Sequence, residues 1–191
     1  MTLIAGPMFA GKSHALIRHS TRLGRAALLV KPGFDTRDGA AVVASRAGAS
    51  AAALPVSRWP VLPPGVGTVL IDEVQFLTAP HYEGDLPADV SAALAAGVDV
   101  IAGGLDTDYL RRPFAVVEAL AAMADRREML HARCHRCEAP ARWTAKKNET
   151  GRRLELGDAD LYEARCDRHW SAPDRSEDPA GMPVPATVPA S

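Results

Sequence analysis

The chain has 191 residues, 47% hydrophobic and 24% charged, which is enough apolar sequence for one substantial core and a small appendage and excludes a disordered or fibrous chain. A formal net charge of -1 and a pI near 6.6 give no electrostatic reason to expect a nucleic-acid or membrane partner. With three cysteines, no signal-like start and no apolar run of roughly 18 residues, we expect a cytosolic protein that binds small solutes.

A phosphate-binding loop follows the apolar run at residues 3–5. It fits the pattern G-x-x-x-x-G-K-[ST], whose glycines let backbone N–H groups wrap closely around a phosphate. Lys12 is expected to reach the β- and γ-phosphates of a nucleotide, and Ser13 to ligate Mg²⁺. A helix expected at residues 13–23 completes the strand–loop–helix context that this chemistry requires. The loop consists of Gly6, Pro7, Met8, Phe9, Ala10, Gly11, Lys12 and Ser13.

Strand and helix patterns alternate along the next hundred residues. Apolar runs at 26–30, 66–73 and 98–105 are typical of strands covered on both faces, and helices are expected at 86–96 and 114–124. This alternation predicts an α/β fold with a mainly parallel sheet. Residues 40–65 are alanine-rich with weak periodicity, which indicates only one strand or helix between loops.

Two carboxylates end the apolar run at 66–73, in the manner of a Walker B motif. Asp72 is expected to hold the Mg²⁺ shell, and Glu73 to face the nucleophile beyond the γ-phosphate. Strands that merely end in solvated acids are common, but the upstream phosphate-binding loop favours the functional interpretation.

Two aromatic residues, Tyr109 and Phe114, follow the next strand. They are either part of the core or the walls of a pocket for a flat ring.

Two short knuckles supply four candidate zinc ligands. Cys134 and Cys137 form one pair, and Cys166 and His169 form the other, with 28 residues between the two pairs. Thiolate and imidazole donors at this spacing suit tetrahedral Zn²⁺, and four protein ligands leave no position for water. The site is therefore expected to be structural. Residues 125–170 contain eleven Lys/Arg and nine Asp/Glu, which argues against a nucleic-acid-binding patch on this lobe.

We expect three regions: a P-loop nucleotide-binding domain at 1–125, a zinc-binding lobe at 126–170, and a disordered proline-rich tail at 171–191. The tail contains five prolines and almost no apolar periodicity.

These motifs together resemble the type II thymidine kinase family over residues 3–170. The resemblance rests on the phosphate-binding loop, Asp35-Thr36-Arg37, Asp72-Glu73-Val74-Gln75-Phe76, residues 105–109, Pro113-Phe114, the two knuckles and residues 162–166. It implies an ATP-dependent kinase of nucleotide salvage with a RecA-like core and a zinc-anchored lasso loop that closes over thymidine. It also implies a homotetramer and inhibition by the end product dTTP.

The resemblance also implies residue roles. Glu73 matches the general base for the 5′-hydroxyl, with Lys12 and Arg37 as the other catalytic residues. The ATP and phosphate set comprises the loop at 6–13, Asp35, Thr36, Arg37, Asp72, Glu73, Val74 and Gln75, with Ser13 and Asp72 toward Mg²⁺. The thymidine set comprises Met8, Phe76, Leu105, Tyr109, Phe114, Thr144, Tyr162 and the lasso residues Arg153, Leu154, Glu155, Leu156 and Gly157.

The chain departs from the family pattern at His14, where a threonine is usual, and at Asp158, which replaces a lasso glycine. The alternative function is a P-loop ATPase module whose zinc lobe binds nucleic acid.

Overall fold

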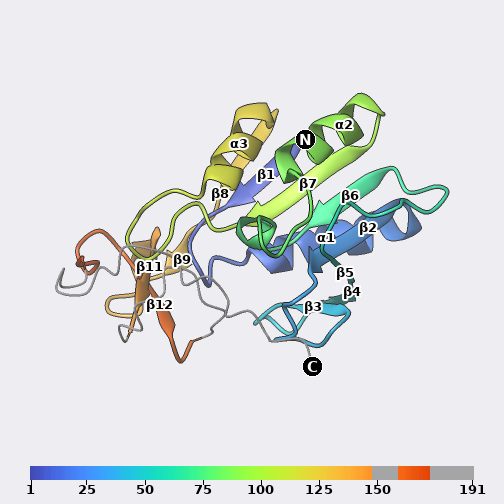
Figure 1. Cartoon of the computed structure of the whole chain (residues 1–191). Helices are drawn as coiled ribbons and strands as arrows, with labels where there is room; N and C mark the ends of the chain where they lie inside the picture. The colour runs from blue at the N-terminus through green and yellow to red at the C-terminus, as the bar shows by residue number, and fades with distance from the viewer. Residues whose placement is uncertain (148–158, 173–191) are drawn as a thin grey trace, which may run out of the picture.

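The computed structural model describes residues 1–147 and 159–172. Within these residues a six-stranded sheet has the order β5-β2-β6-β7-β1-β8, and every neighbouring pair is parallel (Figure 1). This arrangement confirms the predicted α/β class with a mainly parallel sheet. The strands are β1 (Thr2–Ala5), β2 (Ala27–Pro32), β5 (Leu54–Val56), β6 (Thr68–Ile71), β7 (Asp99–Gly104) and β8 (Arg126–Met129).

Successive side chains of a strand point to opposite faces of the sheet. Because the central strands are apolar along their length, both faces of the sheet are apolar. In β1, Leu3 packs into the core on the side of α2 and α3, whereas Ile4 packs against α1 with Leu16. Figure 1 shows α2 and α3 together on one side of the sheet and α1 on the other. The central strands are thus covered on both faces, as their continuous apolar runs predict.

The three expected helices are confirmed within one or two residues at each end. They are α1 (Lys12–Leu23), α2 (Leu86–Ala95) and α3 (Ala115–Met123), with short 3₁₀ turns η1 (Gly24–Ala26) and η2 (Val74–Phe76). The side chain of Asp85 accepts a hydrogen bond from the Ala88 N–H and so caps the start of α2. Beyond the ends of α1 and α2, Gly24 and Gly97 have positive φ values of 57° and 82°, which favour glycine.

Several strands lack a clear signal in the sequence. Residues 40–65 contain the hairpin β3 (Val42–Ala44) and β4 (Ser50–Ala52), and also the edge strand β5, instead of a single element. The other edge strand, β8, is largely exposed and pairs with β1, so the sheet extends past residue 125 to Met129. Edge strands tolerate charged residues and proline, which hides them from periodicity.

The expected zinc-binding lobe, called the zinc lobe below, is made of short strands and lies at the end of the sheet where the phosphate-binding loop emerges from β1 (Figure 1). The lobe consists of β9 (Ala132–Arg133), β10 (Pro140–Ala141), β11 (Trp143–Lys146) and β12 (Tyr162–Arg165), paired as β9–β10 and β11–β12.

The helices in the described ranges are all too short or too polar to span a membrane. The expected lasso residues and almost all of the proline-rich tail lie outside the described residues, so these predictions stay untested.

Candidate active site

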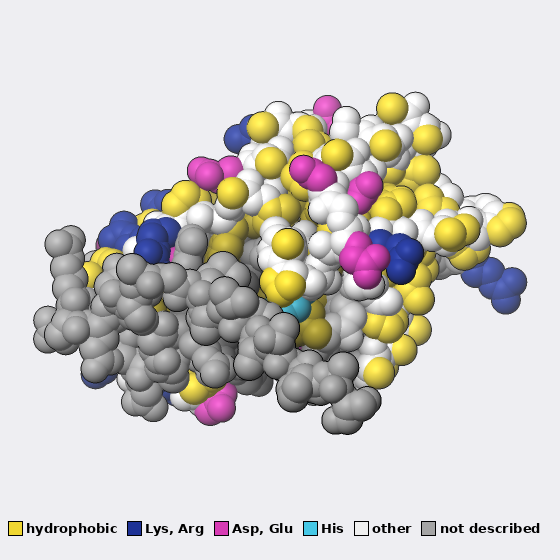
Figure 2. Space-filling model, in the orientation of Figure 1, with side chains coloured by type: hydrophobic (Ala, Val, Ile, Leu, Met, Phe, Trp, Pro, Cys, Tyr) yellow, Lys and Arg dark blue, Asp and Glu magenta, His cyan; other side chains and the backbone are white. Residues whose placement is uncertain are grey.

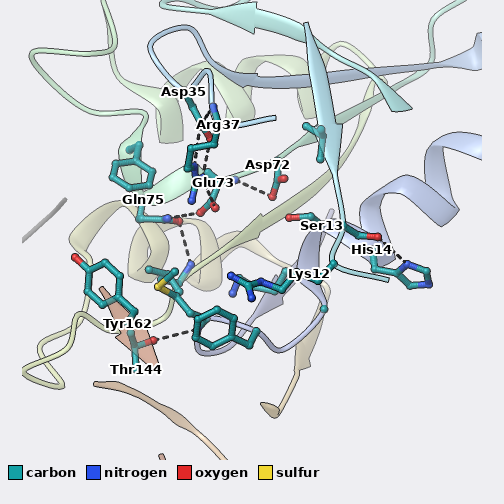
Figure 3. A pocket seen from close by; sticks show the side chains of 18 of the residues that line it. Lys12, Ser13, His14, Asp35, Arg37, Asp72, Glu73, Gln75, Thr144 and Tyr162 are labelled. Atoms are coloured by element: carbon teal, nitrogen blue, oxygen red, sulfur yellow. Dashed lines mark hydrogen bonds and ion pairs between the residues drawn. The ribbon is translucent and has the colours of Figure 1, made fainter. Parts of the chain in front are cut away.

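A pocket of about 1030 Å³ opens where the carboxyl ends of the parallel strands meet the zinc lobe. This volume is enough for more than one small ligand. In Figure 3 the labelled side chains of the phosphate-binding loop, the strand ends and β11 and β12 surround this space. The expected site residues that line it are Met8, Phe9, Gly11, Lys12, Ser13, Asp35, Arg37, Asp72, Glu73, Gln75, Phe76, Leu105, Tyr109, Phe114, Thr144 and Tyr162.

The phosphate-binding loop holds its lysine at the base of the pocket. Lys12 Nζ donates hydrogen bonds to the carbonyl oxygens of Gly6 at 3.0 Å and Pro7 at 2.7 Å. Gly6 has a φ of 147°, and a Cβ there would lie 2.3 Å from the carbonyl oxygen of Leu130, so only glycine fits. Burial lowers the pKa of Lys12, and the charges of Glu73 and Asp72 oppose this shift. The carbonyl oxygens of Gly6 and Pro7 thus hold the Lys12 side chain in place beside two carboxyl groups.

Asp72 and Glu73 lie just past the end of β6 and differ in environment. Burial, reinforced by the neighbouring charge of Glu73, raises the pKa of Asp72, while a hydrogen bond with Ser13 and the charge of Lys12 lower it. The Glu73 N–H donates to Asp72 Oδ1 at 3.0 Å. Glu73 itself has a left-handed backbone, with φ at 53° and ψ at 44°, which residues other than glycine rarely adopt. Such a conformation is typical of functional sites.

Two neighbours hold the carboxylate of Glu73. Arg37 Nη2 donates to Oε1 at 2.9 Å, and Gln75 Nε2 donates to Oε2 at 2.5 Å. Gln75 is buried, and its Oε1 accepts from the Leu105 N–H at 3.0 Å, which ties η2 to the end of β7. A Cβ at Gly104 would lie 2.7 Å from Gln75 Oε1, so this approach requires a glycine. Glu73 is therefore oriented from two sides.

The loop after β2 carries a matched ion pair. Arg37 donates to both carboxylate oxygens of Asp35, from Nε at 2.9 Å and from Nη2 at 2.7 Å. Burial opposes charge on both groups, yet these hydrogen bonds and the mutual attraction lower the pKa of Asp35 and raise that of Arg37. Arg37 consequently stays a cation at the pocket rim.

The other side of the pocket combines aromatic and polar groups from distant segments. Thr144 on β11 accepts a hydrogen bond from the Met8 N–H at 3.0 Å, which joins the zinc lobe to the phosphate-binding loop. Lys146 Nζ lies 5.0 Å from the ring centroid of Tyr109 and 6.0 Å from that of Tyr162. These rings form a buried wall on which a flat ring can stack.

The two knuckles meet, as their spacing predicts. The ligand atoms of Cys134, Cys137, Cys166 and His169 all lie within 4.8 Å of one another. Sulfur–sulfur and sulfur–nitrogen separations of 3.4 to 3.7 Å match the edge of a tetrahedron whose zinc–sulfur bonds are about 2.3 Å long. Cys3His is thus a fitting donor set for Zn²⁺, with all four positions taken by protein atoms.

Comparison with known proteins agrees with this geometry. A family model described as thymidine kinase matches residues 1–170. The chain is 36% identical over 195 residues to a thymidine kinase of Pyrobaculum aerophilum, covering 91% of this chain and 99% of that protein. Thymidine kinases of Mycoplasma mobile and Bdellovibrio bacteriovorus are each 34% identical, covering 86% and 88% of this chain and 83% of each relative.

The chain belongs to the thymidine kinase family.

Some residues that the resemblance to thymidine kinases assigns to the site do not face the pocket. Val74 is fully buried in the core on the side of α2 and α3, and Ala10 packs against the apolar cluster of the zinc lobe. Thr36 is exposed, and Gly6 and Pro7 contribute the carbonyl groups behind Lys12. Arg153, Leu154, Glu155, Leu156, Gly157 and Asp158 lie outside the described residues.

The pocket also contains residues that sequence reasoning missed. Lys31 at the end of β2 is 2% exposed, and its Nζ donates to the carbonyl oxygens of Gly39 at 3.0 Å and Val42 at 2.8 Å. A lysine inside an otherwise apolar strand was the available signal. In the loop of the β3–β4 hairpin, the Oγ of Ser45 lies 3.3 Å from the Nδ1 of His14, and no sequence pattern indicated this contact. The other missed lining residues are Asp38, Val43, Ala44, Arg46, Ala47, Thr107, Asp108 and Arg133.

Proposed function

We propose that this chain transfers the γ-phosphate of ATP to the 5′-hydroxyl of thymidine, giving dTMP and ADP. The observation that carries the proposal is that the buried Lys12 and the Arg37-bound Glu73 open into the same pocket as the Tyr109–Thr144 wall. Family membership supports this function over an ATPase module with a nucleic-acid-binding lobe. Figure 2 shows both acidic and basic side chains on the described part of the visible face. The eleven Lys/Arg and nine Asp/Glu of residues 125–170 disfavour a phosphate-backbone partner for the lobe.

On the donor side, the backbone of the loop at 6–13 and the Lys12 ammonium bind the phosphates. Phosphoryl transfer depends mainly on positioning the reactants and on neutralising charge. Arg37 adds a second cation, which binds one carboxylate oxygen of Glu73 while Gln75 binds the other. Ser13 and Asp72 are the residues that would hold Mg²⁺, whose charge further neutralises the phosphates when bound.

On the acceptor side, Glu73 takes the proton of the 5′-hydroxyl. The hydroxyl oxygen forms the new bond to the γ-phosphorus, and the bond from that phosphorus to the β–γ bridging oxygen breaks, releasing ADP. Arg37 and Gln75 hold both carboxylate oxygens by hydrogen bonds, which fixes the base before the substrate arrives.

The nucleoside base lies against the aromatic side of the pocket in this proposal. Tyr109, Tyr162, Phe76 and Phe114 provide buried apolar surface. Thr144 fixes the position of the phosphate-binding loop relative to β11 through Met8. Residues 153–157 would read the thymine edge with backbone groups, and Zn²⁺ on the Cys3His cluster would anchor both ends of that segment. The wider properties that we infer are a homotetramer, inhibition by dTTP, a cytosolic location and the division near residue 125.

A kinase assay across the natural nucleosides, with ATP and Mg²⁺, tests the proposal. We expect thymidine to be phosphorylated with the highest kcat/KM. Lys12→Met serves as the control for contaminating kinases, because it removes the loop cation while leaving the nucleoside wall in place. Turnover of deoxycytidine or deoxyadenosine without turnover of thymidine would refute the proposed substrate.

A further inference from the structure

A cluster of aromatic and basic side chains joins the sheet domain to the zinc lobe. Arg111, in the connection from β7 to α3, has its guanidinium carbon 3.6 Å from the ring centroid of Trp143 and 4.6 Å from that of Trp170. The two indole rings are 6.5 Å apart with an interplanar angle of 51°. Both guanidinium distances are within the range of cation–π attraction, so one arginine side chain binds two tryptophans.

The tryptophans connect Arg111 to both the metal cluster and the pocket. Trp143 precedes Thr144 on β11, and because successive strand residues face opposite ways, Trp143 lies on the face of β11 away from the pocket. Trp143 Nε1 also donates to Asp167 Oδ1 at 2.6 Å, one residue after the zinc-ligand position Cys166. Trp170 follows the zinc-ligand position His169.

The same cluster also contacts Tyr109, which lies on a different segment of the chain from Thr144. Trp170 Nε1 donates to the carbonyl oxygen of Tyr109 at 3.3 Å, and Tyr109 lines the pocket. Asp108 Oδ1 fixes the adjoining turn by accepting from the N–H groups of Leu110 at 2.9 Å and Arg112 at 2.8 Å. Within this turn Arg111 has a φ of 64°, in the left-handed region that L-residues rarely adopt.

We propose that Arg111 is a positioning residue for the nucleoside. Stacked on Trp143 and Trp170 outside the pocket, it sets the position of Tyr109 relative to Thr144 within the pocket wall. Among the described residues, Arg111 does not line the pocket, so it acts through Tyr109 and Thr144 rather than on the substrate. The inference rests on the proposed function for the identity of its substrate.

Three substitutions at this position separate the side chain from the backbone. Arg111→Ala removes the stack but keeps a residue that disfavours positive φ, whereas Arg111→Gly removes the stack and relieves the backbone. Arg111→Lys keeps the charge but loses the planar group that stacks on an indole. Arg25→Ala, at an exposed arginine in η1, is the matched control.

We expect the alanine and glycine variants to raise the KM for thymidine about tenfold, with kcat and the KM for ATP within about twofold. The lysine variant should recover part of the loss, and Arg25→Ala should match the wild type. Recovery by Arg111→Gly would assign the effect to the backbone and overturn the proposal. An equal rise in the KM for ATP, or no change in either KM, would also overturn it.

Tryptophan fluorescence provides a readout that needs no turnover. The sequence has three tryptophans, so in a Trp59→Phe background the emission comes from Trp143 and Trp170. Arg111→Ala should shift this emission to longer wavelength while zinc per chain stays unchanged, and an unaltered spectrum would contradict the stack. If the wild type phosphorylates another nucleoside instead of thymidine, the proposed substrate fails. The KM of that nucleoside and the fluorescence then still test the role of Arg111.

Discussion

Replacing Glu73 by glutamine keeps the length of the side chain but removes the carboxylate proposed as the general base. General-base assistance contributes about 10²- to 10⁴-fold in rate. This range corresponds to about 2.7 to 5.4 kcal/mol of activation free energy. We expect kcat to fall by at least about a hundredfold. The dissociation constant for ATP should stay within about threefold, because the loop backbone and Lys12 are unchanged.

The contacts of Glu73 set the expected cost in stability. Each carboxylate oxygen accepts one hydrogen bond, from Arg37 at 2.9 Å and from Gln75 at 2.5 Å. An amide has only one acceptor oxygen, so one of these donors loses its partner, at a cost of about 1 to 3 kcal/mol when fully buried. Because the Glu73 side chain is 20% exposed, water can reach it and the lower end, about 1 kcal/mol, is expected. This loss is too small to unfold a typical domain.

The assay compares steady-state kinetics, ATP binding and thermal unfolding of Glu73→Gln with those of Glu83→Gln. Glu83 is a suitable control because its side chain is 66% exposed and pairs with Arg58 at 3.3 Å away from the pocket. A kcat within threefold of the wild type, with ATP binding intact, would remove Glu73 from the chemical step. A large loss of ATP affinity would instead indicate a structural role for the carboxylate.

Two further substitutions test the zinc lobe. Cys134→Ser should reduce zinc from one ion per chain to far less and lower the melting temperature. His131→Ala, at an exposed histidine three residues before Cys134, should retain the metal, and full zinc content in Cys134→Ser would contradict the site. Thr144→Val should raise the KM for thymidine about tenfold, because it leaves the Met8 N–H without its acceptor, while Thr21→Val on α1 should not; unchanged kinetics would show that this contact does not shape the pocket.

Much of the site could be predicted because its chemistry lies in contiguous residues. The phosphate-binding loop combines its glycines, lysine and serine within eight positions, and Asp72 and Glu73 are adjacent at the end of one apolar run. Each cysteine or cysteine–histidine knuckle is likewise a local pair, so four candidate metal ligands could be named before the fold. The ends of α1 and α2 also carry a local signal, because Gly24 and Gly97 lie just beyond them.

The edge strands and the hairpin could not be predicted in the same way. Arg126–Met129 in β8 is mostly exposed, and Leu54–Val56 in β5 contains a proline, so neither shows the apolar run of a central strand. Their place in the sheet is decided by pairing with β1 and β2. Backbone hydrogen bonds to a partner strand, rather than side-chain periodicity, define these elements.

The sequence by itself determined which chemistry the chain carries, because phosphate-binding and metal-binding groups are written in short local motifs. Tertiary structure alone decided how those groups face one another. Thr144 meets Met8 across 136 positions, Gln75 meets Leu105 across 30, and Arg111 stacks on two tryptophans of the zinc lobe. Such contacts arise when separate hydrophobic segments pack together, and the packing of distant segments leaves no period or spacing in the sequence to read.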